Sequence, residues 1–351
     1  MLPPAVPPHN VCLLRLSALG DTCHVVPVLR TLQQAWPTTQ FTWIIGKAEA
    51  RLMTLIEDVE FITVNKRAGL FGMRRELSQR LRGRRFDVML HMQLALRASL
   101  LAQTVHADVK LGYDRARARE LQWLFTNARI PARQCEHTVD LFFGFAEALG
   151  VRERLLRWDV PLPADAQEYA TRSIPDAQPT LVVSPCSSHT LRNWSAERYA
   201  AVADHAMKRH AMRVILVGGP TAFEQKMGAA IARASSGSLI NQIGRDTLPQ
   251  LLALLGRATV LVSPDSGPAH MATAVGTPVI GLYAATRSAR SGPYLSREWC
   301  VDKFAAAARR FRGREPEELP WAEKIEERGV MDLITVEEVT GKLDELLALR
   351  A

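Results

Sequence analysis

Residues 261–283, LVSPDSGPAHMATAVGTPVIGLY, decide the fold class because they contain a complete strand–helix–strand repeat. An apolar run ends just before the polar turn, and a second apolar run follows Pro278. Between them, Pro268 suits the first turn of a helix that Ser266 or Gly267 can cap. The stretch predicts a β-α-β unit whose helix begins at the carboxyl end of a strand, where backbone amides and the helix dipole favour an anion. An ordinary crossover of an α/β protein would carry the same local pattern.

The same alternation of strands and helices runs along both halves of the chain. Expected strands cover residues 11–16, 41–46, 59–64, 86–91, 181–185, 214–219, 259–262 and 279–283. Residues 151–180 are rich in Pro and charge and lack the pattern. We therefore expect an α/β protein with two doubly wound, mostly parallel sheets, one in a domain over 1–176 and one in a domain over 177–351. The last amphipathic helix, about 336–349, could pack on either domain.

The composition supports a globular cytoplasmic protein of two domains. The chain has 351 residues, of which 47% are hydrophobic and 23% charged, and this length is too great for one typical core. No apolar run approaches the ~18 residues of a membrane span. The Pro-rich start lacks the basic and apolar regions of a secretory signal. The five cysteines fall in no C-x-x-C or His/Cys cluster, so neither a disulfide framework nor a metal site is expected.

A net charge of +8 makes nucleic acid, an anionic membrane or a phosphorylated substrate the possible partners. The charge is concentrated in residues 66–85, which contain eight basic residues and one acidic residue. No recognisable nucleic-acid motif and no interleaved aromatic pattern occurs, so we do not expect nucleic acid as a partner. The basic run could also be only a solvated helix face and loop.

Three polar loops follow expected strands: LSALGDTCH at 16–24, SPCSSHTLRNW at 184–194 and SPDSGPAH at 263–270. Neither G-x-G-x-x-G nor G-x-x-x-x-G-K-[ST] occurs, which counts against a dinucleotide or P-loop site. In the second loop, the hydroxyls of Ser187 and Ser188 with the guanidinium of Arg192 suit a diphosphate. Ligands of such sheets bind at the carboxyl ends of strands, so a ligand gripped by both domains would lie in a cleft.

These loops and their flanks resemble a known family. The first loop with VVPVLRTLQQAWP, the stretch SPCSSHTLRNWSAERYAAVAD, VILVGGPTAFE and the long block NQIGRDTLPQLLALLGRATVLVSPDSGPAHMATAVGTPVIGLY are similar to the ADP-heptose:lipopolysaccharide heptosyltransferases, glycosyltransferase family 9. The segment LGYDRARARELQWLFTN at 111–127 resembles the member that adds the first heptose to Kdo.

The resemblance implies a GT-B fold, in which two Rossmann-like domains face a cleft. The N-terminal domain would bind the acceptor and the C-terminal domain the nucleotide sugar. It also implies an inverting transfer of L-glycero-D-manno-heptose from ADP-heptose to Kdo of Kdo-lipid A, without a metal or another cofactor.

The resemblance also assigns donor-binding residues. The pyrophosphate would lie on the helix N-terminus beside Gly267, and Arg192 stands where the family often has Lys. Asp265 would accept from hydroxyls of the heptose or of the ribose, because a carboxylate repels phosphate. His270 would donate to a phosphate or else pack against the next strand, and Glu224 would accept from ribose hydroxyls or else only begin a helix. The full donor set is Ser187, Ser188, Arg192, Glu224, Asp265, Ser266, Gly267 and His270.

Asp21 is the expected general base, because it matches the family's catalytic Asp and an acceptor hydroxyl needs a carboxylate to take its proton. Two alternatives stay open: Asp21 could only cap the first helix, or His24, one turn later, could be the base.

The basic residues at 66–85 gain a role from the same resemblance. Kdo and its phosphates are anionic, so basic side chains would bind the acceptor and hold the enzyme peripherally on the cytoplasmic face of the inner membrane. The expected acceptor-binding residues are Lys66, Arg67, Arg74, Arg75 and Arg119.

Other activities fit the same architecture. Two Rossmann-like domains also serve nucleotide-sugar epimerases and hydrolases, which need no acceptor. A heptosyltransferase acting on a later core heptose and a non-catalytic nucleotide-sugar binding module are further alternatives.

Overall fold

The computed structural model describes residues 2–350, and the chain divides into two compact units between Pro161 and Leu162. We call them the N-terminal unit and the C-terminal unit. The division lies inside the Pro-rich region 151–180 but fifteen residues before the expected boundary at 176/177. Helix α6 (Ala164–Ser173) accounts for this difference, because it packs on α9 (Leu248–Arg257) of the C-terminal unit.

The N-terminal unit is built on a six-stranded parallel sheet in the order β3-β2-β1-β4-β5-β6. Its chain path diverges on either side of β1, so β1 and β4 flank a topological switch point, where open α/β sheets bind ligands. The strands are β1 (Asn10–Leu14), β2 (Gln40–Gly46), β3 (Val59–Val64), β4 (Phe86–His91), β5 (Ala107–Gly112) and β6 (Ala128–Arg129).

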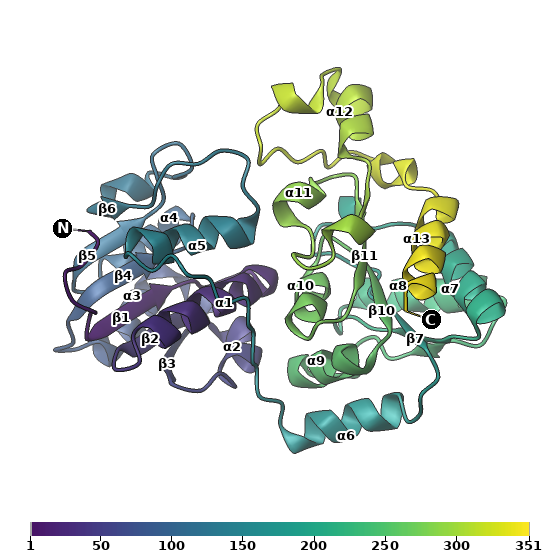
Figure 1. Cartoon of the computed structure of the whole chain (residues 1–351), viewed down its shortest axis with the longest axis horizontal. Coiled ribbons are helices and arrows are strands. Elements are labelled where there is room, and N and C mark those ends of the chain that lie inside the picture. Colours follow the sequence, from purple (N-terminus) through teal and green to yellow (C-terminus); the bar gives the residue numbers. More distant parts are fainter. Residues whose placement is uncertain (1, 351) are drawn as a thin grey trace. The chain divides into compact units, whose positions relative to one another are not determined.

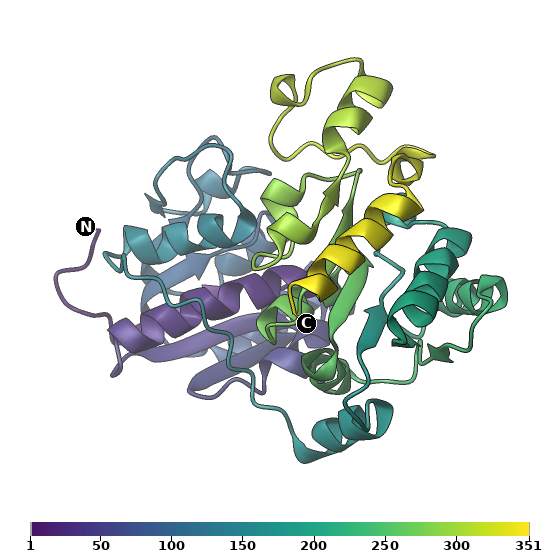
Figure 2. The same cartoon turned by 45° about the vertical axis from the view of Figure 1, so that its right-hand side comes forward.

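Helices cover this sheet, and α1 packs beside α5 in both views (Figure 1 and Figure 2). Helix α1 follows β1 directly and buries Val25, Val28, Leu29 and Leu32 in the core. The helices are α1 (Leu19–Ala35), α2 (Lys47–Met53), α3 (Gly69–Arg80), α4 (Leu96–Ala102) and α5 (Thr138–Ala148), with short 3-10 turns at Lys66–Ala68 and Gln122–Leu124.

The C-terminal unit repeats the same topology in a second parallel sheet of order β12-β11-β10-β7-β8-β9. Here β7 and β10 flank the switch point. The strands are β7 (Thr180–Val183), β8 (Arg213–Leu216), β9 (Ile240–Asn241), β10 (Val260–Pro264), β11 (Val279–Tyr283) and β12 (Val301–Asp302).

The helices of the C-terminal unit include the last helix of the chain, α13, which packs on α7 (Figure 1 and Figure 2). Val339, Leu343 and Leu346 of α13 share one buried cluster with Trp194 and Tyr199. The last helix therefore belongs to the C-terminal core. Besides α6 and α9, the helices are α7 (Ala196–His210), α8 (Ala222–Ala234), α10 (Gly267–Ala274), α11 (Ser288–Ser291), α12 (Phe304–Arg312) and α13 (Val336–Ala348), with short 3-10 turns at Thr190–Arg192, Arg297–Trp299, Pro316–Glu318 and Val330–Leu333.

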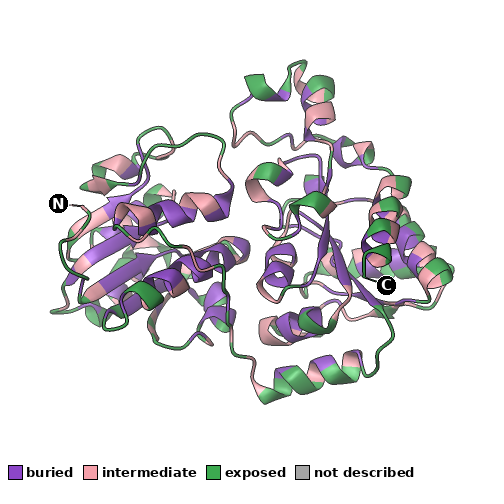
Figure 3. Ribbon diagram, in the orientation of Figure 1, coloured by how far each residue is buried: buried purple, intermediate pink, exposed green. Residues whose placement is uncertain are grey.

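The central strands of both sheets are buried, as Figure 3 shows. Residues 260–264 of β10 and 279–283 of β11 are buried at every position, which is typical of parallel strands covered by helices on both faces. The expected α/β fold with two doubly wound sheets is confirmed. Among residues 2–350, no helix combines the length and the apolarity needed to cross a bilayer.

Candidate functional site

In the N-terminal unit, the loops that follow β1 and β4 are tied together at the switch point. The Gln93 side chain, just after β4, accepts hydrogen bonds from the backbone N–H of Leu16 at 3.0 Å and of Ser17 at 3.3 Å. The buried Arg15 guanidinium donates to the carbonyl oxygen of Met92. The loop that precedes the expected base is thus fixed to the neighbouring strand end.

Asp21 lies in the first turn of α1, beside this loop. Its Oδ2 accepts from Arg15 Nη2 and, at 3.3 Å, from the backbone N–H of Ala18. The Asp21 side chain is nevertheless 33% exposed, whereas that of Arg15 is 9% exposed. Asp21 therefore makes a capping hydrogen bond and also presents a carboxylate that a substrate can reach.

The rival base, His24, is in a different environment. It is buried, with only 3% exposure, and its ring lies 5.8 Å from that of His137 in an edge-to-face arrangement. Because the imidazole of His24 is buried, an acceptor hydroxyl can reach it less easily than it can reach the carboxylate of Asp21.

The segment that carries Arg119 is anchored to the same end of the sheet. The amide of Gln122 donates to the carbonyl of His91 at 2.8 Å and to that of Gln93 at 3.2 Å, and the Tyr113 hydroxyl donates to Met92 at 3.0 Å. Arg119 is exposed. The structure therefore brings the RARARE segment and the loop before Asp21 to the carboxyl ends of strands β1 and β4.

The other expected acceptor-binding residues differ in their partners. Lys66 donates to the buried Glu49 at 2.8 Å, so its charge is offset inside the protein. Arg67, Arg74 and Arg75 are exposed, and no carboxylate of residues 2–350 forms an ion pair with them. These three arginines are thus the better candidates for an anionic ligand.

In the C-terminal unit, the loops that follow β7 and β10 meet through Arg192 and Asp265. Arg192 Nη1 lies 3.1 Å from Asp265 Oδ2, and Arg192 Nε donates to Glu326 Oε1 at 2.8 Å. The Arg192 side chain is only 9% exposed. Two carboxylates therefore hold this guanidinium at the switch point.

Asp265 is held from a second side as well. Thr286 Oγ1, after β11, donates to Asp265 Oδ2 at 2.9 Å. The neighbouring Ser266 is the N-cap residue of α10, but its hydroxyl pairs with that of Ser263 at 2.8 Å and makes no capping hydrogen bond. The first N–H groups of α10 are therefore not capped by their own N-cap side chain, as an anion site at a helix N-terminus requires.

The remaining donor candidates lie on loops and helix starts of the same unit. His270 is buried in the first half of α10, and Gly267 is its first residue. The backbone N–H of Ser187 donates to Asn193 Oδ1 at 2.6 Å, which fixes the loop after β7, and Ser188 is exposed.

Glu224 closes the glycine turn after β8. Its carboxylate accepts from the backbone N–H of Gly219 and from Thr221 Oγ1 at 3.1 Å. A Cβ at position 219 would lie 2.9 Å from Glu224 Oε1, so a side chain there would push this carboxylate away from the turn. Nearby, burial and the charge of Glu224 raise the pKa of Asp246 to about 6.

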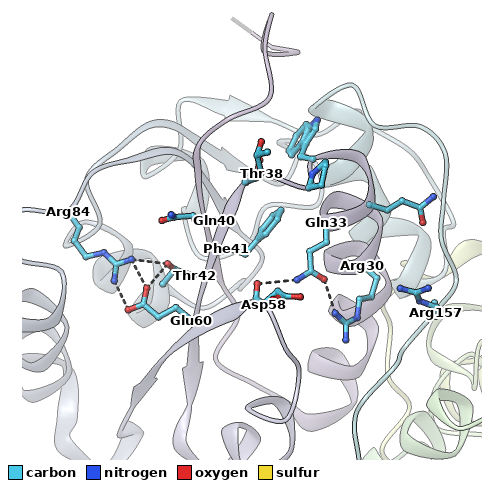
Figure 4. A pocket seen from close by; sticks show the side chains of 14 residues that line it. Arg30, Gln33, Thr38, Gln40, Phe41, Thr42, Asp58, Glu60, Arg84 and Arg157 are labelled. Carbon is cyan, nitrogen blue, oxygen red and sulfur yellow. Dashed lines mark hydrogen bonds and ion pairs between the residues drawn. The ribbon is translucent and has the colours of Figure 1, made fainter.

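A pocket of about 740 Å³ lies elsewhere in the N-terminal unit (Figure 4). Arg84 and Glu60 face each other on one side of it, joined by two hydrogen bonds of 2.7 and 2.6 Å, and Arg84 lowers the pKa of Glu60. Gln40 and Asp58 place this pocket at the amino ends of β2 and β3. Because ligands of parallel sheets bind at the carboxyl ends, we assign it no part in the reaction.

Some residues at these sheet ends were not predicted from the sequence. Glu326 lies in WAEKIEERG, where charged residues look like a solvated turn, and Arg15 ends an apolar run. Gln93 and Thr286 each come shortly after a strand. Their place at a strand end is the only feature of the sequence that could have identified them.

Comparison with known proteins agrees with this arrangement. The sequence model of glycosyltransferase family 9 (heptosyltransferase) matches residues 74–319. Lipopolysaccharide core heptosyltransferase OpsX of Haemophilus influenzae is 38% identical over 339 residues, which cover 97% of each chain. Lipopolysaccharide heptosyltransferase 1 of Pseudomonas aeruginosa is 25% identical over 301 residues, which cover 81% of each chain.

Solved structures agree in fold. The family 9 glycosyl transferase from Veillonella parvula has a TM-score of 0.79 at 21% identity and covers 97% of each chain. The Escherichia coli heptosyltransferase WaaC with ADP has a TM-score of 0.74 at 22% identity, covering 96% of this chain and 99% of that chain. The expected GT-B fold is thereby confirmed. With two Rossmann-like units and a family match over most of its length, the chain belongs to glycosyltransferase family 9, the heptosyltransferases.

Proposed function

We propose that this enzyme transfers L-glycero-D-manno-heptose from ADP-heptose to Kdo of the lipopolysaccharide inner core, with inversion at the anomeric carbon. The observation that carries the proposal is the pair of fixed polar sheet ends. One presents the accessible carboxylate of Asp21 in the N-terminal unit, and the other presents Arg192, Asp265 and the start of α10 in the C-terminal unit. The relatives whose names include lipopolysaccharide heptosyltransferase support the choice of sugar and acceptor.

The donor-binding residues lie in the C-terminal unit. The pyrophosphate of ADP-heptose would accept from the first N–H groups of α10 and from Arg192, with the Ser187 and Ser188 hydroxyls as further donors. Asp265 would accept from sugar hydroxyls, since Arg192 and Thr286 fix its carboxylate. Glu224 would accept from ribose hydroxyls beside the glycine turn.

The reaction needs one base and one stabilised leaving group. Asp21 takes the proton from the acceptor hydroxyl, whose oxygen forms a bond to the anomeric carbon of the heptose. The bond from that carbon to the phosphate oxygen breaks, and ADP leaves with the electron pair. Arg192 and the α10 dipole would stabilise the charge that develops on ADP.

Arg15 is a positioning residue in this scheme. Its guanidinium contacts Asp21, donates to the carbonyl of Met92 and lies 5.3 Å from the Phe142 ring centroid. These contacts hold one carboxylate oxygen of Asp21 in place and leave the other for the acceptor.

We assign acceptor binding and peripheral membrane attachment at the cytoplasmic leaflet to the exposed basic residues of the N-terminal unit. Phe71 on α3 is 87% exposed, and Arg74 and Arg75 follow it on the same helix face. An apolar ring flanked by arginines suits the headgroup region of an anionic membrane. Arg67 and Arg119 would contact the anionic groups of Kdo.

Product analysis with ADP-heptose, with and without Kdo-lipid A, tests the function. We expect ADP release only when Kdo-lipid A is present, together with a product heavier by one heptose. ADP release without acceptor would identify a hydrolase, and a changed sugar nucleotide without ADP release an epimerase. Transfer only to an acceptor that already carries heptose would place the enzyme at a later core step.

A further inference from the structure

Two histidines of α7 and one aspartate of α13 converge at a point that includes none of the candidate donor-binding, acceptor-binding or catalytic residues. His205 Nε2 lies 2.7 Å from Asp344 Oδ1, and His210 Nε2 lies 2.6 Å from the same oxygen. The three donor atoms lie within 4.8 Å of one another. Their side chains are 27%, 22% and 31% exposed, so solvent ions can reach them.

This donor set is that of a transition metal. Two imidazole nitrogens and one carboxylate oxygen are ligands of Zn²⁺, and with open positions they also suit Co²⁺, Ni²⁺ and Fe²⁺. Bonds of about 2.0–2.2 Å require donor atoms about 3.3–3.5 Å apart in a tetrahedral site. Opening the two contacts to Asp344 by less than 1 Å would therefore admit an ion.

The surroundings of Asp344 also fit a metal ligand. Arg209 Nε lies 3.2 Å from Asp344 Oδ2, whereas both histidines contact Oδ1. A second group that holds the distal carboxylate oxygen is the usual way to orient such a ligand. The same residue also adds positive charge, which opposes a cation and lowers the affinity of the site.

We propose that His205, His210 and Asp344 form a divalent transition-metal site that joins the C-terminal helix α13 to α7. Helix α7 begins at the loop that carries Arg192, and its histidines lie roughly 15–20 Å further along the helix axis. The ion therefore takes no part in transfer. Its effect is on stability, because a ligand that binds only the folded state stabilises it.

The test uses full-length protein without a polyhistidine tag, cleared of metal by a chelator and titrated with Co²⁺. We expect one Co²⁺ per chain with visible d–d absorption bands, and a thermal midpoint that rises with added Zn²⁺. His205→Gln, His210→Gln and Asp344→Asn should each weaken Co²⁺ binding by at least about 10–100-fold, because each removes one of three ligands and even the loss of a group that orients a ligand has an effect of this size.

Two matched controls separate this site from adventitious binding. His106→Gln removes an exposed histidine of the N-terminal unit, and Cys135→Ser removes an exposed thiol. Both should bind Co²⁺ like the unmodified protein. The proposal is overturned if no stoichiometric Co²⁺ binding occurs, or if binding survives in the folded His205→Gln/His210→Gln double variant. In those cases the three residues form only a hydrogen-bonded ion-pair cluster.

Discussion

Asp21 and His24 stand one turn apart on α1, yet only one of them suits the work of a general base. The Asp21 carboxylate is one-third exposed and held by Arg15, whereas His24 is buried. The sequence left both as candidates because it shows the spacing of side chains and not their burial.

Replacing Asp21 by Asn should separate catalysis from capping. Asn keeps the shape and much of the capping ability, so the free energy of unfolding should change by less than about 1 kcal/mol. Turnover should fall on the order of 10²–10⁴-fold, the usual contribution of a general base. Steady-state kinetics and urea denaturation measure the two effects. The matched change His24→Gln keeps a polar side chain of similar length in the core and should cost far less turnover; the reverse result would make His24 the base.

Arg192 and Asp265 should have separable effects on ligand affinity. Arg192→Ala should weaken ADP and ADP-heptose alike by about 1.5–3 kcal/mol, the range of a hydrogen bond to a charged group. Asp265→Ala should weaken ADP-heptose more than ADP, because its proposed partners are sugar hydroxyls. Calorimetric titration with both ligands checks this, and equal losses in Asp265→Ala would assign that carboxylate to the ribose.

Asp246 should make the stability of the C-terminal unit depend on pH. Its folded pKa of about 6 exceeds that of the unfolded chain, so its stabilising contribution is present below about pH 4 and is lost as pH rises through 6. Asp246→Asn should therefore raise the free energy of unfolding by about 1–3 kcal/mol more at pH 8 than at pH 4. Urea titrations at both pH values measure this difference, and a pH-independent effect would contradict it.

At the scale of elements, the sequence predicted long periodic segments well and short strands poorly. The expected strands 59–64, 86–91 and 279–283 agree with β3, β4 and β11. Strands β6, β9 and β12 were missed, because two residues carry no periodicity. The six-residue strand β5 was also missed, because its side chains are mixed in polarity and only partly buried. Glu326 was missed for a related reason: its contact with Arg192 spans 134 residues, and no local pattern reports such a distance.

Helix α3 offers a test of membrane attachment. Exchanging Arg74 and Arg75 for Glu should reduce binding to vesicles containing anionic lipid and raise the KM for Kdo-lipid A, more strongly at low salt, while ADP affinity stays the same. Phe71→Ser should lower vesicle binding without this salt dependence, because it removes only apolar contact. Vesicle sedimentation with neutral lipid is the control. Equal use of delipidated and intact acceptor by all variants would show that these residues are only surface charge.

At the scale of the whole molecule, the two sheets share one strand order, and each carries its candidate residues at its own switch point. The sequence predicted this because the β-α alternation fixes parallel sheets and the polar loops mark strand ends. The expected boundary at 176/177 lies after the division at Pro161–Leu162, because α6 follows the Pro-rich linker and has buried residues that pack on α9.

Hydrogen exchange measured with and without ADP tests which of the two units binds the nucleotide. Amides of residues 184–194 and 263–270 should exchange more slowly when ADP is bound, because the ligand stabilises the local folded state. Residues 15–24 should keep their rates with ADP alone. Protection confined to residues 15–24 would place the nucleotide in the N-terminal unit and contradict the proposal.

The division of the chain at a single point, Pro161–Leu162, also bears on how such enzymes can diversify. Recombination between two genes at this point would leave both hydrophobic cores whole, so the chimaeric offspring could still fold. If the first half selects the molecule that receives the sugar and the second half selects the sugar, a recombinant enzyme can acquire a new recipient molecule and still transfer the same sugar. The specificity for the recipient and the specificity for the sugar can then evolve independently.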